Sequence, residues 1–353
     1  MTKTFFKSSI FALLIIVATI VACLTSCMGM TDISESGDNE AENRLEVHFI
    51  DVGQADAALV ICDGDTMLID GGNSDDSRLI YTYLKKNNVT NLDYIIATHA
   101  HEDHVGGLSG ALDFARAEVA LCPVTQYESR AFSNFVKGLK QQDLEITIPK
   151  AGDSFSLGSA KVNVLACNAA DDPNNSSIVL KLIYGDTSFL FAADAEYECE
   201  TAMLDAGYDL SSTVLKVGHH GSYTSTSYRF LKEADPQYAV ISCGKNNDYG
   251  YPHDEIVSRL ENADVTYYRT DLLGDIICTS DGKSVSFNVN KADEKADADN
   301  ETSREMILNT GSKRYHEIGC ESIPEIRENN KQSYFGTTVE IESLGYYPCG
   351  SCH

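Results

Sequence analysis

The chain has 353 residues, of which 43% are hydrophobic, and this is enough for one large globular domain and a second, smaller one. Its formal net charge is −26 at pH 7. An acidic surface repels polyanions at long range. Tight, extended binding of nucleic acid would therefore require a local basic patch. The main part of the chain has no basic run.

The N-terminal segment has the layout of a secretory signal. Lys3 and Lys7 precede an apolar stretch from Ile10 to Val21 that is short for a membrane span. The Leu-Thr-Ser-Cys sequence that ends at Cys27 resembles a bacterial lipobox, which implies cleavage after residue 26 and lipid attached to Cys27. We therefore expect residues 1–26 to be a lipoprotein signal peptide and the mature protein to be an extracytoplasmic, membrane-anchored lipoprotein. An uncleaved signal anchor and ordinary secretory cleavage are the alternatives.

Residues 27–44 are acidic and polar and predict a flexible tether. From residue 45 to residue 290, short apolar runs alternate with amphipathic helical patterns. Strands are predicted at 45–52, 57–61, 66–69, 92–97, 162–165, 178–182, 189–192, 214–217, 238–242 and 265–268, and helices at 79–84, 108–114, 132–139, 198–204, 228–231 and 255–260. Two halves of this kind, each a sheet with helices outside it, predict an α/β (α+β) fold, a four-layer αββα sandwich over residues 45–290.

Four side chains that can bind metal ions follow the predicted strand at 92–97: His99, His101, Asp103 and His104. His99 and His101 lie two residues apart on an extended segment and point the same way, so they can bind one ion. Asp103 and His104 lie on the next turn and face a second site. Carboxylate and imidazole ligands suit zinc, manganese or iron. The pattern predicts two divalent ions; a histidine-rich surface loop that binds nothing is the alternative.

Further candidate ligands stand at the ends of later predicted strands. Asp194 follows the strand at 189–192, and the adjacent His219 and His220 follow the strand at 214–217. His253 opens a predicted helix. A structural role is also open for Asp194, as the N-cap of a helix, and for His253, as a residue at a helix start.

Together these motifs resemble the metallo-β-lactamase superfamily, and within it the branch that contains the hydrolase domain of ComEC-type DNA-uptake proteins and related secreted phosphodiesterases. The resemblance covers residues 45–290. Its motifs are Asp51-Val-Gly-Gln54-Ala-Asp56, Leu-Ile-Asp70-Gly-Gly, Thr-His99-Ala-His101-Glu-Asp103-His104, Ala-Asp194-Ala, Lys216-Val-Gly-His219-His220-Gly-Ser222 and Tyr-Pro-His253.

The resemblance implies a role for each matching residue. One metal ion would be held by His99 and His101, the other by Asp103 and His104, and Asp194 would bridge them. One histidine of the 219–220 pair would be a ligand while its neighbour orients substrate or a ligand, and His253 would lie at the pocket rim or bind metal. Catalysis would rest on Asp103, His219 and His220, and support for ligands or substrate on Asp51, Gln54, Asp56, Asp70, Ser177 and Ser222.

One departure from the superfamily concerns the segment before the bridging aspartate. Many members carry a separate histidine there, whereas residues 174–178 of this chain read Asn-Asn-Ser-Ser-Ile. The ion beside His99 and His101 is therefore expected to have fewer protein ligands.

The C-terminal part is predicted to consist of a charged linker at 291–306 and a small module at 307–353. His316-x₃-Cys320 and Cys349-x₂-Cys352 have the spacing of a zinc module, with a disulfide as the alternative. The segment resembles the zinc domain of Ada-type DNA-repair proteins. Histidine replaces that family's methyl-accepting cysteine, so the resemblance implies a structural zinc and a structural or DNA-contacting role without methyl transfer.

We expect a surface-anchored, metal-dependent phosphodiesterase or nuclease that acts on DNA or another phosphodiester, with a hydroxide held between two zinc ions, or manganese ions, as the nucleophile. A teichoic-acid or phosphocholine esterase, or a lactonase of the same fold, is the first alternative. A non-catalytic surface DNA-binding module is the second. The expected partners are the membrane, through lipid on Cys27, and DNA; the sequence identifies no protein partner.

Overall fold

The computed structural model describes residues 44–167, 170, 172–289, 304–320, 322–336, 341, 344 and 346–349. The predicted signal peptide and lipid site at Cys27, most of the predicted tether, residues 290–303 and Cys352 lie outside the described residues. Within the described ranges, no helix has both the length and the apolar character needed to cross a membrane.

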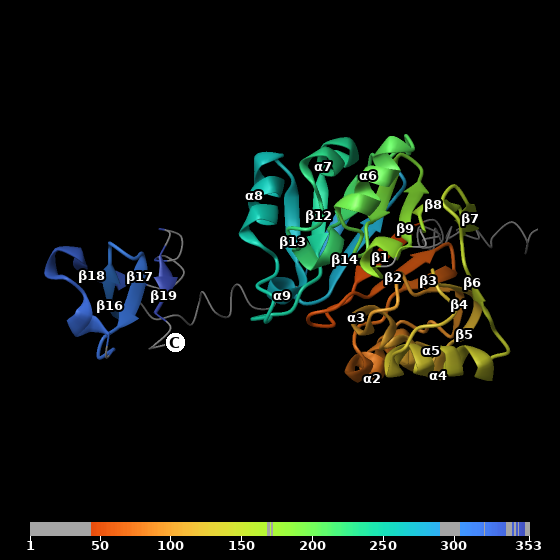
Figure 1. Cartoon of the computed structure of the whole chain (residues 1–353), viewed down its shortest axis with the longest axis horizontal. Helices are drawn as coiled ribbons and strands as arrows, with labels where there is room; N and C mark the ends of the chain where they lie inside the picture. Colours follow the sequence, from red (N-terminus) through yellow and green to blue (C-terminus); the bar gives the residue numbers. More distant parts are fainter. Residues whose placement is uncertain are drawn as a thin grey trace, which may run out of the picture. The chain divides into compact units, whose positions relative to one another are not determined.

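The first sheet has eight strands in the order β15-β14-β1-β2-β3-β4-β5-β6 (Figure 1). Its central strands β3, β4 and β5 are parallel, and its other pairs from β15 to β3 are antiparallel. The strands are β1 (Leu45–Phe49), β2 (Ala58–Cys62), β3 (Asp65–Ile69), β4 (Asn91–Ile96), β5 (Arg116–Leu121), β6 (Ile146–Thr147), β14 (Ile276–Ser280) and β15 (Val285–Val289). Its helices are α2 (Ser77–Lys86), α3 (Glu102–Val105), α4 (Leu108–Phe114) and α5 (Arg130–Gln141).

The second sheet has seven strands in the order β13-β12-β11-β10-β9-β8-β7, with β10 to β13 parallel. The strands are β7 (Ser154–Leu157), β8 (Ala160–Ala166), β9 (Val179–Tyr184), β10 (Thr187–Phe191), β11 (Val214–Lys216), β12 (Tyr238–Ile241) and β13 (Thr266–Arg269). Its helices are α6 (Tyr197–Asp205), α7 (Tyr228–Ala234) and α8 (Asp254–Asn262), and the short α9 (Thr270–Leu273) leads from β13 to β14.

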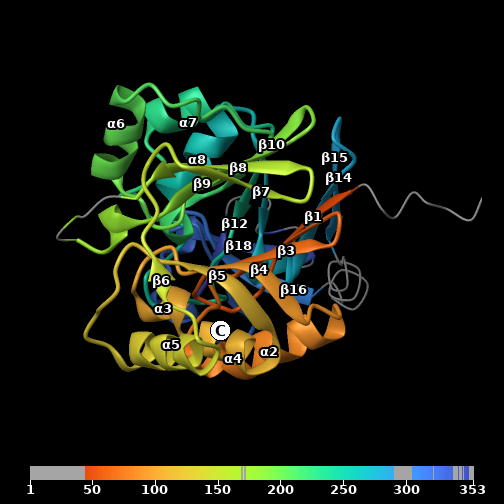
Figure 2. The same ribbon diagram turned by 90° about the vertical axis from the view of Figure 1, so that its right-hand side faces the viewer.

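Figure 2 shows the layers of helices and sheets from the side. Three apolar cores of buried side chains lie between these four layers. Side chains alternate along each strand, so Leu68 packs on the helices of its own half whereas Met67 and Ile69 pack between the two sheets. In the second half, Leu190 packs in the same core as Phe230 of α7. The predicted αββα sandwich is confirmed, and burial of both faces explains the continuous apolar runs of its strands.

The candidate site residues lie where strands of both sheets end. Asp70 follows β3, the His99–His104 segment follows β4, Asp194 follows β10, and the His219–His220 pair follows β11. The carboxyl ends of parallel strands meet at one edge of a sheet, which is where open α/β folds place their chemistry. The topology therefore brings segments that are distant in sequence to one edge of the sandwich.

The C-terminal residues form a separate four-stranded sheet in the order β18-β16-β17-β19. Its strands are β16 (Arg304–Asn309), β17 (Arg314–Glu317), β18 (Lys331–Gly336) and β19 (Tyr347–Pro348). A small core joins Met306, Leu308, Tyr315, Ile341 and Tyr346. Strand β16 begins at Arg304, three residues before the predicted start of the module at residue 307, because the charged residues before Met306 give the start of the strand no apolar pattern.

Candidate metal centre

Four side chains from three loops converge on a space that suits one metal ion. Asp103 and His104 of α3, Asp194 after β10 and His220 after β11 each offer one ligand atom, and these atoms lie within 4.8 Å of one another. His104 Nε2 lies 3.3 Å from Asp194 Oδ1, and His220 Nε2 lies 3.3 Å from Asp103 Oδ2. Separations of this size are those between ligands that share an ion at about 2.0–2.2 Å.

Two atoms of this cluster are buried without a hydrogen-bond partner among the described residues: His104 Nε2 and Asp194 Oδ1. An unsatisfied buried polar atom costs about 1–3 kcal/mol, so a pair that face each other at 3.3 Å requires an explanation. A divalent cation between them would satisfy both. The residues present therefore fit the metal that the motif predicts.

The electrostatics of the cluster favour a cation. Burial opposes ionisation of Asp194, yet His104 and His220 hold the pKa of its carboxyl well below its usual range. Burial alone would lower the pKa of His104, but the carboxylates of Asp194 and Asp70 raise it well above the ordinary histidine value. A cavity that stabilises a proton on a fully buried imidazole is one in which a metal ion is also stabilised.

His99 and His101 form a second group of histidines beside the first. His99 Nε2 lies 3.1 Å from His101 Nδ1 and 3.9 Å from Asp194 Oδ2, while Asp194 Oδ1 faces His104. Asp194 is thus within reach of both histidine groups, as a bridging carboxylate must be. It is not a helix cap, because α6 begins at Tyr197 and its N-cap is Glu196.

Buried oxygen atoms orient the histidines of the first group. Asp70 Oδ2 lies 2.8 Å from His104 Nδ1, whereas His220 Nδ1 donates to Ser242 O at 3.1 Å and also lies 3.2 Å from Asp56 Oδ1. Asp56 also pairs with the ammonium group of Lys216 at 2.8 Å, and Lys216 together with His220 holds the pKa of Asp56 below its usual range despite burial. Metal-bound histidines are ordinarily held in this way through the nitrogen that does not bind the metal.

The backbone of the His219–His220 pair is left-handed at both residues, with φ of 50° and 54°. The left-handed backbone conformation costs of order 1–3 kcal/mol for each non-glycine residue, and residues strained in this way occur mainly at functional sites. The pair is held by hydrogen bonds from His219 N–H to Ala193 O (2.8 Å) and from Ser222 N–H to His219 O (2.7 Å). This conformation directs both imidazoles toward Asp194.

The two adjacent histidines differ in their surroundings. His220 is buried within the four-residue cluster. The side chain of His219 is 17% exposed, its Nε2 lies 3.6 Å from Asp194 Oδ2, and its Nδ1 lies close to Thr224 Oγ1 (3.2 Å) and Glu196 Oε1 (3.3 Å). His219 therefore stands at the open side of the centre, where a substrate can reach it.

Three other predicted residues make contacts outside the cluster. His253 is the N-cap of α8, and its Nδ1 accepts a hydrogen bond from Tyr223 N–H at 3.0 Å. Asp51 accepts from Gly53 N–H, and Gln54 Oε1 accepts from Gly244 N–H. These contacts hold the loops around the metal centre in place. The candidate metal ligands are therefore the residues described above.

The two predicted serines lie close to the centre in different ways. Ser222 Oγ lies 3.0 Å from Thr224 Oγ1, within the set of contacts that fixes His219. Ser177 is fully buried, and no described group makes a hydrogen bond to its Oγ. It stands where many superfamily members have the separate histidine, and the next residue, Ile178, donates through its N–H to Thr98 O.

Several residues that hold the ligands have no assigned role in the sequence motifs. Thr98 donates to Asp70 through both its N–H and its hydroxyl, at 2.8 and 2.7 Å. Thr224 and Glu196 orient His219, and no sequence pattern marks them. Lys216 stands in one of the motifs, and its pairing could be predicted because a lysine inside an apolar strand is expensive to bury unless it is paired.

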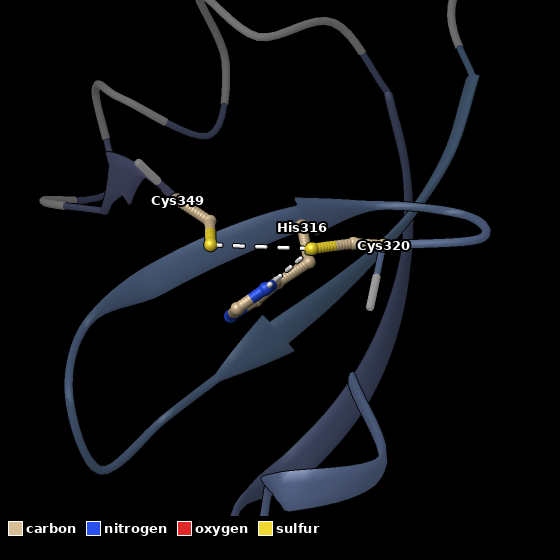
Figure 3. Close-up of side chains that lie close together, drawn as sticks. All are labelled: His316, Cys320 and Cys349. Atoms are coloured by element: carbon tan, nitrogen blue, oxygen red, sulfur yellow. Dashed lines mark hydrogen bonds between the residues drawn. The ribbon is translucent and has the colours of Figure 1, made fainter. Parts of the chain in front are cut away.

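A second cluster lies in the C-terminal sheet, where His316, Cys320 and Cys349 are buried and close together (Figure 3). Cys320 Sγ lies 3.5 Å from His316 Nδ1 and 4.0 Å from Cys349 Sγ. A disulfide requires about 2.05 Å, so these two sulfurs are not bonded. The separations are close to those between ligands of a tetrahedral zinc ion with bonds of about 2.0–2.3 Å.

Comparison with known proteins places the sandwich in a family. A model of the metallo-beta-lactamase superfamily matches residues 50–245. ComE operon protein 3 of Bacillus subtilis (strain 168) is 29% identical over 251 residues, which cover 65% of this chain and 32% of that protein. Competence protein ComA of Neisseria gonorrhoeae is 29% identical over 236 residues, which cover 66% of this chain and 32% of that protein. The chain thus spans about a third of the length of these curated relatives.

Comparison with solved structures finds similar chains at low sequence identity. The metallo-beta-lactamase fold protein YhfI of Bacillus subtilis is 12% identical, with a TM-score of 0.46, and the match covers 67% of this chain and 100% of that one. The predicted likeness to the superfamily and to competence proteins is confirmed. Because the family model matches more than half of its length, the chain belongs to the metallo-beta-lactamase superfamily, whose members are in general metal-dependent hydrolases.

Proposed function

We propose that this protein is a phosphodiesterase with a two-metal centre. The observation that carries the proposal is the position of Asp194, whose Oδ1 lies 3.3 Å from His104 Nε2 and whose Oδ2 lies within 3.9 Å of Nε2 of His99, His219 and His220. A carboxylate shared by two imidazole groups is suited to two ions about 3.5–4 Å apart, an arrangement common in enzymes that cleave phosphate esters. Similarity to competence proteins makes nucleic acid the first substrate to consider.

The residues divide into two ligand sets that share one carboxylate. Asp103, His104, Asp194 and His220 would hold one ion, and His99, His101 and Asp194 would hold the other. Zinc or manganese bound there supplies a Lewis acid and lowers the pKa of a water molecule. Asp70 and Asp56 keep His104 and His220 in the tautomer that presents Nε2 to the centre.

His219 is proposed to act on the leaving group. Its Nδ1 is fixed by Glu196 and Thr224, so its Nε2 is the nitrogen that can give a proton to a departing oxygen. Asp103 is the most exposed carboxylate of the cluster, at 32% of its side chain, and can accept a proton from the attacking water. These assignments give the pair His219 and His220 different roles: His219 moves a proton, and His220 binds metal.

The C-terminal module is proposed to be held by a structural zinc ion. His316, Cys320 and Cys349 provide three ligands at suitable separations, and Cys352 is the expected fourth. A module with five residues in its core gains much of its stability from such a bond. The lipid anchor on Cys27, an extracytoplasmic location and contact with DNA complete the proposal, and they rest on the N-terminal sequence and the motif resemblances.

The proposed chemistry is tested with a panel of substrates and the purified, metal-loaded protein. Single-stranded DNA, bis(p-nitrophenyl) phosphate, a phosphocholine ester and a lactone represent the competing activities. We expect hydrolysis of the DNA and of bis(p-nitrophenyl) phosphate, and none of the lactone. Preferential hydrolysis of the phosphocholine ester would favour the esterase alternative, and preferential hydrolysis of the lactone would contradict phosphodiester chemistry.

A further inference from the structure

A continuous series of aromatic rings leads from the metal centre to the protein surface. The ring of Tyr251 is stacked on His220 with centroids 6.2 Å apart, and Tyr249 is stacked on Tyr251 at 5.3 Å with an angle of 13° between the planes. On another side, His253 lies against Tyr251 at 5.0 Å, and Tyr223 lies against His253 at 4.9 Å. The tyrosines at the two ends of the series are 66% exposed (Tyr249) and 55% exposed (Tyr223).

The loop that carries two of these rings is held in place before any substrate arrives. Asn247 Oδ1 accepts hydrogen bonds from the N–H groups of Tyr249 (3.2 Å) and Tyr251 (2.9 Å), and its Nδ2 donates to Gly244 O. Gly244 N–H in turn donates to Gln54 of the β1–β2 loop. A loop fixed in this way loses little conformational entropy when a ligand binds to it.

The chemistry of this surface selects flat, uncharged groups. Asp248 and Asp254 flank the aromatic residues in sequence, and the protein as a whole carries a charge of −26. Attraction between the protein and a phosphate backbone therefore cannot supply the affinity. Stacking on aromatic side chains can, because every nucleobase has a π-face, and a stacked base is worth about 5- to 100-fold in affinity.

We propose that Tyr223, Tyr249 and Tyr251 form a stacking platform that binds a nucleobase beside the scissile phosphodiester of single-stranded nucleic acid. The proposal rests on the proposed phosphodiesterase function and adds the recognition of its substrate. The platform begins on a candidate metal ligand, His220, so a base stacked on it places the neighbouring phosphate toward the centre. Base-paired strands keep their bases stacked inside the duplex and cannot use the platform.

The experiment compares two single-stranded oligonucleotides of equal length and charge: oligothymidylate and its abasic analogue. Binding to the full chain is measured by fluorescence anisotropy, and hydrolysis is measured as kcat/KM. Tyr249→Ala removes the outermost ring, and Tyr249→Phe keeps the ring without its hydroxyl. Tyr228→Ala is the control, because Tyr228 is 65% exposed but lies over Arg259 of α8, outside the platform.

We expect the wild-type protein to prefer oligothymidylate to the abasic strand, and Tyr249→Ala to reduce that preference about 5- to 100-fold. Tyr249→Phe and Tyr228→Ala should keep it. Equal binding of the two strands by the wild-type protein, or a preference that survives Tyr249→Ala, would overturn the platform. Hydrolysis of bis(p-nitrophenyl) phosphate reports the metal centre separately: if it proceeds while the base preference is absent, the platform fails and the phosphodiesterase stands. Base-dependent binding without any hydrolysis would support the platform and contradict the phosphodiesterase function.

Discussion

The carboxylate of Asp70 lies 2.8 Å from Nδ1 of His104, and both side chains are almost completely buried. Asp70 is itself fixed by two hydrogen bonds from Thr98, at the end of the neighbouring strand β4. The imidazole can therefore present only its Nε2 to the metal centre. Asp70, at the carboxyl end of β3, thus sets the orientation of His104, which follows the parallel strand β4.

Asp70→Asn is expected to weaken metal binding about 10- to 100-fold, because the amide orients His104 less strongly than a carboxylate and raises its basicity less. Asparagine tolerates the left-handed backbone of this position, where φ is 58°, so the fold should persist. Competition with a chelator of known affinity measures the effect. Asp113→Asn on the exposed side of α4 is the matched control, and equal affinities of the two variants would contradict this role of Asp70.

Substitution of His219 and of His220 by asparagine, one at a time, should separate the roles of these two residues. Asparagine accepts the left-handed backbone conformation of both positions. His220→Asn is expected to bind about one metal ion fewer. His219→Asn is expected to keep its metal and to lose about 10²- to 10⁴-fold in kcat, because the proton donor is removed. Metal analysis of both variants beside their pH–rate profiles provides the comparison. Loss of metal from His219→Asn and retention in His220→Asn would reverse the assignment.

A buried lysine far from the centre gives a pH-dependent contribution to stability. Lys181 of β9 is buried, and its Nζ lies 2.7 Å from Asp209 Oδ2. This hydrogen bond lowers the pKa of the Asp209 carboxyl below its usual range. A lowered folded-state pKa stabilises the protein above the unfolded-state value, and that contribution is lost as the pH falls through the folded-state pKa.

Asp209→Asn should therefore reduce the free energy of unfolding by about 1 kcal/mol at pH 7, since the side chain of Asp209 is largely exposed and solvent screens the pair. The difference from wild type should begin to shrink as the pH falls below about 4, the unfolded-state pKa, and should vanish only below the lower folded-state pKa, where wild-type Asp209 is protonated. Urea denaturation at several pH values measures it. Asp205→Asn, which breaks an exposed pair with Arg229, should change nothing measurable at any pH.

Removal of a ligand from the C-terminal cluster should remove one zinc ion. Cys320→Ser is expected to bind about one equivalent less zinc than wild type and to expose the small core around Met306 to proteolysis. Cys167→Ser, at a partly buried cysteine of the sandwich, should keep the full zinc content. Equal zinc content in both variants, or a disulfide at Cys320 found by mass spectrometry, would exclude the structural zinc.

Much of this architecture could be predicted from the sequence, because short apolar runs and the polar residues at their ends are local signals. The segments at His99, Asp194 and His219 were each predicted at a strand end, and the structure brings them together there. What could not be predicted depends on side-chain direction. Asp51 and Asp70 both follow strands of the first sheet, yet only Asp70 contacts a ligand among the described contacts.

The choice between His219 and His220 could not be made from sequence for a similar reason. Adjacent residues in a strand point to opposite faces, whereas two consecutive left-handed residues direct both imidazoles toward Asp194. No short motif predicts the tyrosine platform either, because its rings come from two loops, one fixed by hydrogen bonds of Asn247 and the other by the bond from Tyr223 N–H to His253.

The central claim is that Asp194 joins two metal sites into one phosphodiesterase centre. The most direct test is the rate of bis(p-nitrophenyl) phosphate hydrolysis by the metal-loaded protein and by its Asp194→Ala variant, with metal content measured on the same samples. We predict hydrolysis by the wild-type protein that a chelator abolishes, and a loss of at least about 10³-fold in the variant together with bound metal. Hydrolysis that survives Asp194→Ala, or a wild-type protein that binds two metal ions and does not cleave the diester, would contradict the account.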